Sequence, residues 1–410
     1  MNILHLQHSV YPQTAGYRIH KALLDMGINS KYFVQYKYVD DTSVITDSRK
    51  RSRPINYLKS GLDQIPLKFY PKYNHSYFSP AIAPDNLISQ LQSISLDIVN
   101  LHWICGGFIR IESLKKITHP LVWTLYDSWP FTGGCHIPYE CEGYIKKCGK
   151  CPILKSSSEF DLSHWIWKRK MASWKDLNLT IVASSHWMEK SVRSSSLFHN
   201  CRIDVIPTGI DTNQFTPTSK DIARSNVSLP INKKIILFGA VNCTTTYNKG
   251  FHLLKKALKK LNGVLNKKET EIIIFGGDPP AESQDIGFKI TYLGKIDDAT
   301  LAQLYRSADV FVAPSLSDNL PNTVMEALSS GTPCVAFQIG GMPDMIDHLK
   351  NGYLARPFDP DDLAKGIEWI LSDENRWQSL SKNARQKILR EFDIIIIAKK
   401  YSTLYNEILN

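Results

Sequence analysis

The chain has no long hydrophobic run. No stretch approaches the roughly 18 consecutive apolar residues that a membrane-spanning helix needs, although hydrophobic residues make up 43% of the 410 residues. The first ten residues, MNILHLQHSV, lack the basic segment that opens a secretory signal. Internal repeats and low-complexity tracts are absent as well. We therefore expect a globular, soluble protein that resides in the cytoplasm.

Acidic residues are scarce in the first half of the chain. Residues 1–211 hold 25 Lys and Arg against 17 Asp and Glu, whereas residues 212–410 hold 24 against 22, so most of the net charge of +10 belongs to the first half. Two basic clusters stand out there: Arg49, Lys50, Arg51 and Arg53, and Lys168, Arg169 and Lys170. Such clusters either attract anionic lipid headgroups, a polyanionic acceptor or nucleic acid, or form part of a scattered solvated surface. The sequence leaves both interpretations open.

Strand and helix signals alternate along the chain. Apolar runs typical of strands, such as DIVNLHW (97–103) and PLVWTLY (120–126), alternate with segments that have helical patterns. The alternation restarts at KKIILFGAV (233–241). This order predicts an α/β fold in which helices cover both faces of parallel sheets. A chain of 410 residues is too long for one ordinary core, so we expect two domains of about 200 residues each. The boundary is expected within VIPTGIDTNQF (205–215).

The most informative motif is PSLSDNLPNTVMEALSSGTPCVA, at residues 314–336. It predicts a strand, a polar loop and then a helix that ends at Gly331, with seven residues between the carboxylates of Asp318 and Glu326. An α-helix leaves its first amides without intrahelical acceptors, so its N-terminus suits a phosphate. Glu326, one turn further in, can accept hydrogen bonds from ribose hydroxyls. The predicted nucleotide diphosphate site comprises Asp318, Asn319, Leu320, Pro321, Asn322, Thr323 and Glu326.

With its flanking residues, this motif resembles the donor site of the retaining glycosyltransferases of the GT-B fold, family 4 or "group 1". These share a carboxylate, seven residues, Glu-Ala-Leu, two small residues and Gly-Thr-Pro, although their first carboxylate is usually Glu. The resemblance spans nearly the whole chain, and it implies two facing Rossmann-like, doubly wound parallel-sheet domains with a C-terminal cross-over helix. We expect an acceptor-side domain over residues 1–207 and about 392–410, with a Cys-rich insertion at 133–153, and a nucleotide-sugar donor domain over 208–391.

The same resemblance assigns further donor-site residues. Lys249, in NKGF before a predicted helix, matches the lysine that similar enzymes place on the diphosphate. Ile296, in LGKI, matches the segment that meets the nucleotide base. The other expected donor-binding residues are Gly16 and Arg18, after the first strand, and Gly276 and Gly277, whose small size permits close approach of a ligand.

Two residues of the first domain are candidates for catalysis. A lone histidine such as His102, in DIVNLHW, is more often structural than functional, but the resemblance implies contact with the transferred sugar. Asp127 follows the strand signal PLVWTLY and is expected to face the acceptor. The segment from Trp123 to Pro152 is very like a bacterial branch of the family that makes surface polysaccharides. With Lys249 and Glu326, these two residues form the predicted catalytic set.

Four of the eight cysteines fall within 17 residues: Cys135, Cys141, Cys148 and Cys151. Their spacing suits a structural zinc with four thiolate ligands. Two disulfides or free thiols are the alternatives, and a reducing cytoplasm argues against the disulfides. Because four thiolates close the coordination sphere, no catalytic role is expected for the metal.

The predicted function is that of a retaining glycosyltransferase that needs no metal for catalysis. The expected donor is a UDP- or GDP-sugar, and the expected acceptor is a hydroxyl of a bacterial surface polysaccharide or lipid-linked oligosaccharide, met at the inner face of the cell membrane by a peripherally attached enzyme. A GT-B sugar-nucleotide epimerase or phosphorylase is one alternative. A basic, zinc-bearing nucleic-acid-binding protein is another, although no recognisable module interleaves the basic residues with stacking aromatics. The donor nucleotide and the oligomeric state are not determined by the sequence.

Overall fold

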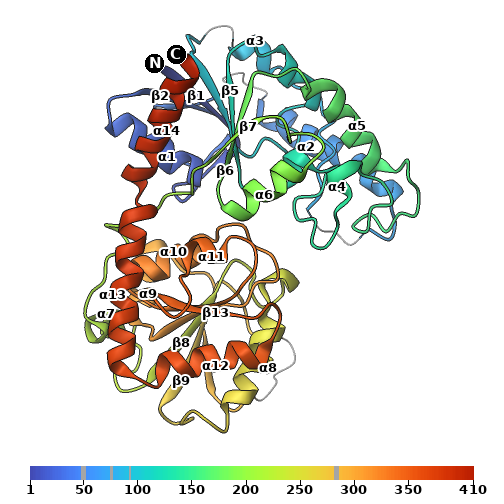
Figure 1. The fold of residues 1–410 in the computed structure, drawn as a ribbon. Helices are drawn as coiled ribbons and strands as arrows, with labels where there is room; N and C mark the ends of the chain where they lie inside the picture. Colours follow the sequence, from blue (N-terminus) through green and yellow to red (C-terminus); the bar gives the residue numbers. More distant parts are fainter. Residues whose placement is uncertain (48–51, 74–76, 92–93, 281–285) are drawn as a thin grey trace. The chain divides into compact units, whose positions relative to one another are not determined.

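The computed structural model describes residues 1–47, 52–73, 77–91, 94–280 and 286–410. The chain divides into two compact units. The N-terminal unit comprises Met1–Thr208 together with Ile397–Asn410, and the C-terminal unit comprises Gly209–Ile396. Each unit is built on one parallel sheet flanked by helices (Figure 1). The predicted α/β fold with two parallel sheets is therefore confirmed.

The N-terminal unit has a seven-stranded sheet with the order β3-β2-β1-β4-β5-β6-β7, in which all neighbouring strands are parallel. Its central strands are buried on both faces, and their sequences are predominantly apolar. The strands are β1 (Asn2–Val10), β2 (Asn29–Lys37), β3 (Val44–Thr46), β4 (Ile98–Leu101), β5 (Leu121–Leu125), β6 (Leu179–Ala183) and β7 (Arg202–Val205).

Helices and short 3-10 turns connect these strands. They are α1 (Ala15–Asp25), α2 (Ser52–Gln64), η1 (Ile65–Phe69), α3 (Leu87–Leu91), η2 (Ile111–Lys116), η3 (Trp129–Phe131), α4 (Gly143–Lys146), α5 (Leu162–Trp174) and α6 (His186–Ser194). The N-termini of α5 and α6 are capped by side chains, because Asp161 accepts from the amides of Ser163 and His164 and Ser185 accepts from the amide of Met188.

The last helix, α14 (Ile394–Leu409), packs on the N-terminal unit over most of its length. Two fully buried tyrosines attach it to the sheet. The hydroxyl of Tyr405 accepts a hydrogen bond from Asn100 Nδ2 at 2.6 Å, and the hydroxyl of Tyr401 lies 2.9 Å from Thr124 Oγ1. Buried hydrogen bonds of this kind fix the helix on the sheet in one register.

The C-terminal unit has a six-stranded parallel sheet with the order β10-β9-β8-β11-β12-β13. Its strands are β8 (Lys234–Gly239), β9 (Thr270–Phe275), β10 (Lys289–Tyr292), β11 (Val310–Ala313), β12 (Cys334–Phe337) and β13 (Gly352–Ala355). Its helices are α7 (Lys220–Asn226), η4 (Tyr247–Lys249), α8 (Phe251–Leu261), α9 (Asp298–Ser307), α10 (Asn322–Ser329), α11 (Met342–Met345), α12 (Pro360–Leu371) and α13 (Glu374–Glu391).

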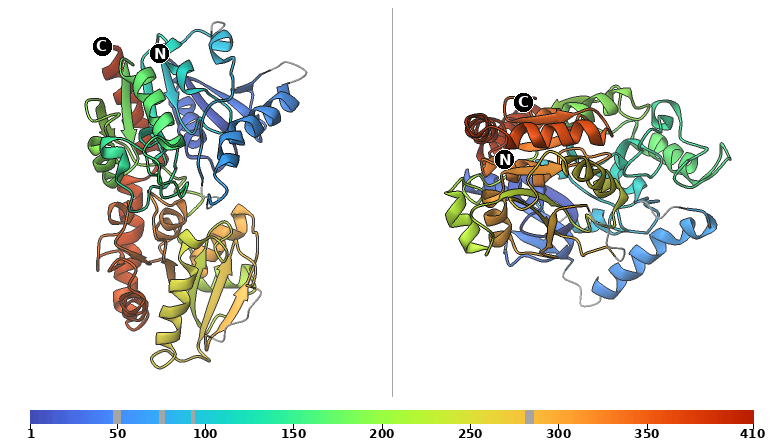
Figure 2. Two further views of the ribbon diagram at one scale, coloured as in Figure 1. Left: turned by 90° about the vertical axis from the view of Figure 1, so that its right-hand side faces the viewer. Right: turned by 90° about the horizontal axis from the view of Figure 1, so that it is seen from below.

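The core of the C-terminal unit forms two layers, one on each face of its sheet. Successive strand residues point to opposite faces, so Ile235 and Leu237 of β8 pack in one layer and Ile236 and Phe238 in the other. Helices α9, α10 and α13 cover the first face. Helices α8 and α12 lie side by side on the second (Figures 1 and 2). Among the residues that the structure describes, no helix is both long and apolar enough to cross a membrane.

Candidate functional site

Four loops converge at the carboxyl edge of the C-terminal sheet. The amide of Gly276, after β9, donates to the carbonyl of Gly294, after β10, at 2.6 Å. Gly276 has a φ of 72°, and a Cβ at this position would collide with the carbonyl of Ala240, which follows β8. Both its conformation and its close neighbour therefore require glycine. The next residue, Gly277, faces Cys243 and Thr244 of the same β8 loop.

The loop before α8 is joined to the loop before α10. The amide of Leu316 donates to the carbonyl of Asn248 at 2.8 Å, and Asn248 Nδ2 donates to the carbonyl of Ser317 at 2.7 Å. Gly250, with a φ of 70°, lies so close to Pro314 that a Cβ would overlap its carbonyl oxygen. These contacts hold the two loops together although their residues are separated by more than sixty positions in the sequence.

This junction brings Lys249 and Asp318 together. Lys249 Nζ lies 2.8 Å from Asp318 Oδ2, and the two side chains are 27% and 18% exposed. Ser315 Oγ donates a further, longer hydrogen bond of 3.4 Å to the same carboxylate oxygen. The backbone carbonyl of Asp318 accepts from the amide of Gly341 at 3.2 Å, which fixes the loop ahead of α10. The ammonium of Lys249 is thus held beside the loop that leads into α10.

Helix α10 starts at Asn322, directly after Pro321, as the motif predicts. The first turn of an α-helix has no preceding turn whose carbonyls could accept its amides, so this end bears the positive end of the helix dipole. Glu326 lies in the second turn and is only 8% exposed. Its Oε2 accepts a hydrogen bond of 3.0 Å from the hydroxyl of Tyr305, whose pKa burial raises well above its usual value.

The remaining predicted donor-side residues border the same edge of the sheet. Leu320 is buried in the core below α10, and Ile296 is half-buried at the rim of that core. Asn319 and Pro321 lie in the loop between β11 and α10. The structure therefore brings the predicted residues of the C-terminal unit to one place.

In the N-terminal unit, His102 follows β4 and is buried in a stack of aromatic rings. Its Nε2 lies 2.8 Å from Nδ1 of His5, and its Nδ1 lies 2.8 Å from the hydroxyl of Tyr126. The rings of His5 and His102 stack with centroids 5.1 Å apart, and Tyr32 stacks against both. Burial, together with the nearby His20, lowers the pKa of His102 to about 3. Both ring nitrogens are thus engaged by this unit, and the ring is neutral at physiological pH.

Gly16 and Arg18 lie in the first turn of α1. A Cβ at Gly16 would collide with the hydroxyl of Tyr32 and lie 2.9 Å from the ring of His102, so glycine is required for the helix to pack on the aromatic stack. Arg18 Nη1 donates to the carbonyl of Gln13 at 2.8 Å. These contacts give Gly16 a packing role beside the donor-binding role predicted for it.

Asp127 accepts three hydrogen bonds from its own chain. Its Oδ1 accepts from the amide of Trp129 at 2.9 Å, and its Oδ2 accepts from Trp103 Nε1 at 3.0 Å and lies 2.7 Å from His136 Nδ1. The other ring nitrogen of His136 lies 2.8 Å from Ser79 Oγ. The carboxylate therefore fixes the segment that leads into the Cys-rich insertion, and its expected contact with an acceptor stays a prediction.

The four clustered cysteines are all free thiols in the structure, so the disulfide alternative is not observed. Cys135, Cys148 and Cys151 are buried, Cys141 is half-buried, and Cys148 Sγ accepts from the amide of Gly133 at 3.1 Å. Burial raises the pKa of Cys148 to about 12. Across the described part of the chain, no group of three or more His, Cys, Asp or Glu side chains is arranged to hold a metal ion. Zinc binding stays a prediction.

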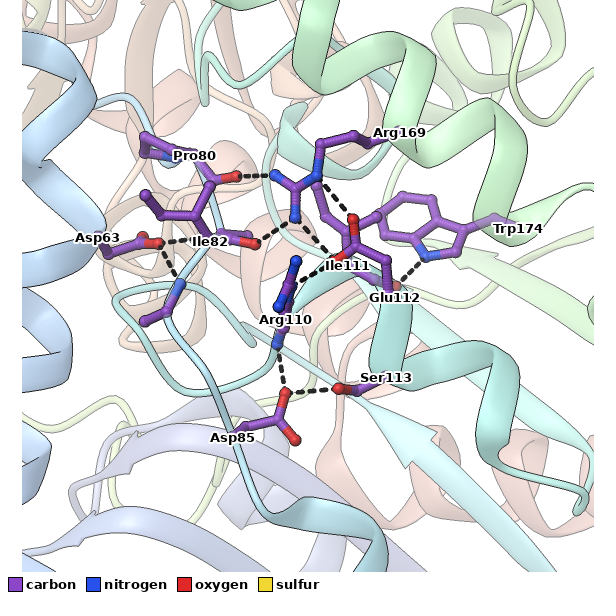
Figure 3. Close-up of polar contacts among 12 residues, drawn as sticks. Asp63, Pro80, Ile82, Asp85, Arg110, Ile111, Glu112, Ser113, Arg169 and Trp174 are labelled. Atoms are coloured by element: carbon purple, nitrogen blue, oxygen red, sulfur yellow. Dashed lines mark hydrogen bonds and ion pairs between the residues drawn. The ribbon is translucent and has the colours of Figure 1, made fainter.

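The basic cluster at residues 168–170 does not form a charged surface, which corrects one of the two interpretations above. Lys170 is fully buried, where it donates to the carbonyls of Trp129 and Thr132, and burial lowers its pKa to about 7. Arg169 forms an ion pair with Glu112 at 2.7 Å and donates to two backbone carbonyls at 3.0 Å (Figure 3). Only Lys168 is exposed. In the other cluster, residues 49–51 and the side chain of Arg53 lie outside the described part of the structure.

Three residues of these sites were not predicted from the sequence: His5, Tyr126 and Tyr305. His5 interrupts the apolar strand β1 and lies opposite Tyr32 and Asn100 on the two neighbouring strands. A polar side chain within a buried strand is the signal that could have identified it. Tyr126 and Tyr305 carry no such signal, because tyrosine is common in cores with its hydroxyl paired.

Two family models match the chain one after the other. The model described as "Glycosyltransferase Family 4" matches residues 40–214, and the one described as "Glycosyl transferases group 1" matches residues 220–387. An uncharacterized glycosyltransferase of Methanocaldococcus jannaschii is 27% identical over 282 residues, which are 66% of this chain and 70% of the relative. For the next seven curated relatives, the match spans only 28% to 48% of the relative's length.

Solved structures resemble the whole chain. Sucrose-phosphate synthase from Thermosynechococcus elongatus superimposes with a TM-score of 0.70 at 18% identity, with 99% of each chain covered. HepE of Anabaena, crystallised in complex with UDP, superimposes with a TM-score of 0.63 at 16% identity, with 99% of this chain and 100% of that chain covered. At such identities the likeness establishes a shared fold.

Proposed function

This chain belongs to the group 1 glycosyltransferases with the GT-B fold, and from that premise we propose that it transfers a sugar from a nucleotide diphosphate sugar to an acceptor hydroxyl with retention of configuration. One observation supports this proposal above the others. The ammonium of Lys249 and the N-terminus of α10 lie together at the carboxyl edge of the C-terminal sheet, with the buried carboxylate of Glu326 one turn behind. Open α/β sheets bind their ligands at this edge.

The chemistry of the donor accounts for each of these groups. When the glycosidic bond breaks, negative charge grows on the departing diphosphate, and fixed donors stabilise it best. The first amides of α10 and the ammonium of Lys249 would supply positive charge, and Glu326 would accept hydrogen bonds from the ribose hydroxyls. In the free protein the carboxylate of Asp318 pairs with Lys249 and orients its ammonium, so that the cation is already in place when a diphosphate arrives.

In the proposed reaction the leaving group departs ahead of the attack, which gives an oxocarbenium-like state at the anomeric carbon. The acceptor hydroxyl then attacks on the face that the diphosphate leaves, and its proton passes to a phosphate oxygen of the leaving group. His102, which is neutral, would position the transferred sugar. No step in this scheme requires a divalent cation.

The donor nucleotide is proposed to be UDP or GDP, and UDP is supported by the likeness to HepE, which was crystallised with that nucleotide. The proposed acceptor is a hydroxyl of a bacterial surface polysaccharide or of its lipid-linked precursor, met by an enzyme that attaches peripherally to the cytoplasmic face of the membrane. No observation favours an epimerase or a phosphorylase. The nucleic-acid-binding alternative loses much of its basis, because Arg169 and Lys170 are engaged within the protein.

The test is thermal unfolding in the presence of UDP, GDP and their common sugar conjugates. A ligand that binds only the folded state raises the melting temperature, by an amount that grows with the ratio of its concentration to Kd. We expect one nucleotide series to stabilise the wild type, and Glu326→Ala to weaken that stabilisation. Lys260→Ala is a control for a change of charge outside the site, since it removes an exposed lysine that pairs with Asp361. Absence of stabilisation by every nucleotide would refute the proposal.

A further inference from the structure

Helix α2 exposes its apolar side chains and buries polar ones. A surface helix usually does the reverse, because its apolar stripe packs on the core. In α2, Asn56 and Asp63 are 7% and 0% exposed, whereas Leu58 and Leu62 are 67% and 45% exposed. Every exposed residue from position 54 to position 64 is uncharged. The outward face of α2, at the surface of the N-terminal unit (Figure 2), is therefore largely apolar.

This face continues into η1, which follows α2 without a break. Ile65 and Phe69 of η1 are 41% and 79% exposed. Apolar residues that recur every three or four positions lie on one side of a helix. Single exposed apolar residues are common on soluble proteins, but a continuous row of them marks an interaction surface. The row, named the apolar stripe below, consists of Ile55, Leu58, Leu62, Ile65 and Phe69.

Polar contacts hold the inward face of α2 on the N-terminal unit. Ser60 Oγ donates to the carbonyl of Gly106 at 2.8 Å. Asp63 Oδ1 accepts from the amides of Ile82 and Ala83 at 2.7 and 3.3 Å (Figure 3). None of these contacts involves the apolar stripe. Substitutions in the stripe should therefore leave α2 in place.

The charges near the apolar stripe are positive. In the sequence, residues 49–72 hold seven Lys and Arg against one Asp, a surplus of six (7 − 1) in a chain whose net charge is +10. Lys68 and Lys72 are exposed beside the stripe. The one carboxylate of this segment, Asp63, is buried against backbone amides. An anionic bilayer attracts basic side chains to its headgroups and accepts apolar side chains below them.

A second copy of the chain matches this face less well. A two-fold dimer pairs a surface patch with itself. Such pairing would bring the lysines of both copies together, and the buried Asp63 could not separate them. The charge of the face therefore favours an anionic lipid surface over a symmetric dimer.

We propose that α2 and η1 dock the protein on an anionic membrane, with the apolar stripe among the acyl chains and Lys68 and Lys72 at the headgroups. This inference rests on the proposed function, because it names the surface that makes the peripheral attachment included there. The binding of vesicles does not depend on the donor site, since Lys249 and α10 belong to the other compact unit.

The test is cosedimentation of the full chain with vesicles of phosphatidylcholine, alone or in an equal mixture with phosphatidylglycerol. We expect stronger binding to the anionic vesicles, and weaker binding at high salt. Leu58→Ser combined with Leu62→Ser should weaken binding at least about tenfold by removing apolar side chains from the acyl region. Lys68→Gln combined with Lys72→Gln should weaken it by about 5- to 30-fold.

Each double variant has a matched control in the C-terminal unit. Ile222→Ser with Ile231→Ser removes two apolar side chains that are 61% and 52% exposed. Lys267→Gln with Lys268→Gln makes the same change of net charge in an exposed loop. Both controls should bind vesicles as the wild type does. The melting temperature of every variant shows whether it is folded.

Four results would overturn the proposal. They are no binding to anionic vesicles, equal binding to neutral ones, a stripe variant that binds like its control, and a wild-type dimer in light scattering that the stripe variant converts to a monomer. The last result would assign the face to a second copy of the chain.

Thermal unfolding with UDP-glucose and GDP-mannose on the same samples separates this failure from that of the proposed function. A wild type that binds anionic vesicles but no nucleotide would refute the donor site and still support the docking face. A wild type that is stabilised by a nucleotide sugar but binds no vesicle would refute the docking face and leave the donor site supported.

Discussion

Replacement of Lys249 by alanine should separate ligand binding from folding. In the free protein the lysine pairs with Asp318 at 2.8 Å, and both side chains retain access to solvent. Ion pairs of this kind stabilise a fold by about 0–1 kcal/mol. A hydrogen bond to a charged group contributes more, about 1.5–3 kcal/mol. We therefore expect Lys249→Ala to lower kcat/KM for the donor by about 10- to 150-fold, and to lower the free energy of unfolding by less than about 1 kcal/mol.

The measurements are steady-state kinetics with the nucleotide sugar identified by thermal unfolding, and urea denaturation without ligand. A cycle with Asp318→Ala then tests why the pair exists. If the carboxylate acts mainly by orienting the ammonium, Asp318→Ala should reduce kcat/KM in the wild type and have little further effect in the Lys249→Ala background. Wild-type kcat/KM in Lys249→Ala would refute the assignment of the cation to the diphosphate. A loss fully explained by unfolding would refute it equally.

Three further predictions concern the N-terminal unit. Gly16→Ala should lower both turnover and melting temperature, because the added methyl group collides with Tyr32 and crowds His102; unchanged values would show that the aromatic stack is not closely packed. Burial lowers the pKa values of His8, His20 and His102 to about 4, 4 and 3. Below pH 6.5 the unfolded chain therefore binds more protons than the folded chain does. The free energy of unfolding should fall as pH falls from 6.5 toward 4, by up to about 1.4 kcal/mol per pH unit for each histidine. Urea denaturation across that range measures the slope, and a flat profile would contradict neutral burial. Cys148→Ser should lower the melting temperature. The zinc content of the purified wild type and of the variant shows whether this loss of stability reflects a lost metal ion. A variant that retains both the melting temperature and the metal content would count against structural zinc.

The parts of the fold that follow from local sequence could be predicted. Strands such as β11 are continuous apolar runs because both faces of a parallel sheet are covered. The loop and helix that carry Asp318 and Glu326 appear where the motif places them, since spacing along one segment determines their geometry. The family resemblance supplied the rest of the architecture, because the pairing of distant strands leaves little trace in a single sequence.

Contacts between distant segments could not be predicted in the same way. His5 and His102 are 97 residues apart, and their pairing depends on β1 and β4 being neighbours in the sheet. The interpretation of residues 168–170 as a charged surface was wrong for a related reason. Arg169 and Lys170 are adjacent in α5, but neighbouring residues of a helix point about 100° apart, so Arg169 reaches Glu112 whereas Lys170 enters the core.

The distribution of charge along the sequence likewise does not identify the proposed functional site. Residues 1–211 hold a surplus of eight positive charges, yet the proposed anion site lies in the half whose surplus is only two. Arg110 and Arg169 share the carboxylate of Glu112, and Lys170 is buried against backbone carbonyls, so these three cations are already engaged within the N-terminal unit. Recognition of a diphosphate needs few charges held in fixed positions. One lysine beside the start of α10 meets that requirement better than a basic cluster, so raising the salt concentration should weaken nucleotide binding only to the degree expected for about one ion pair.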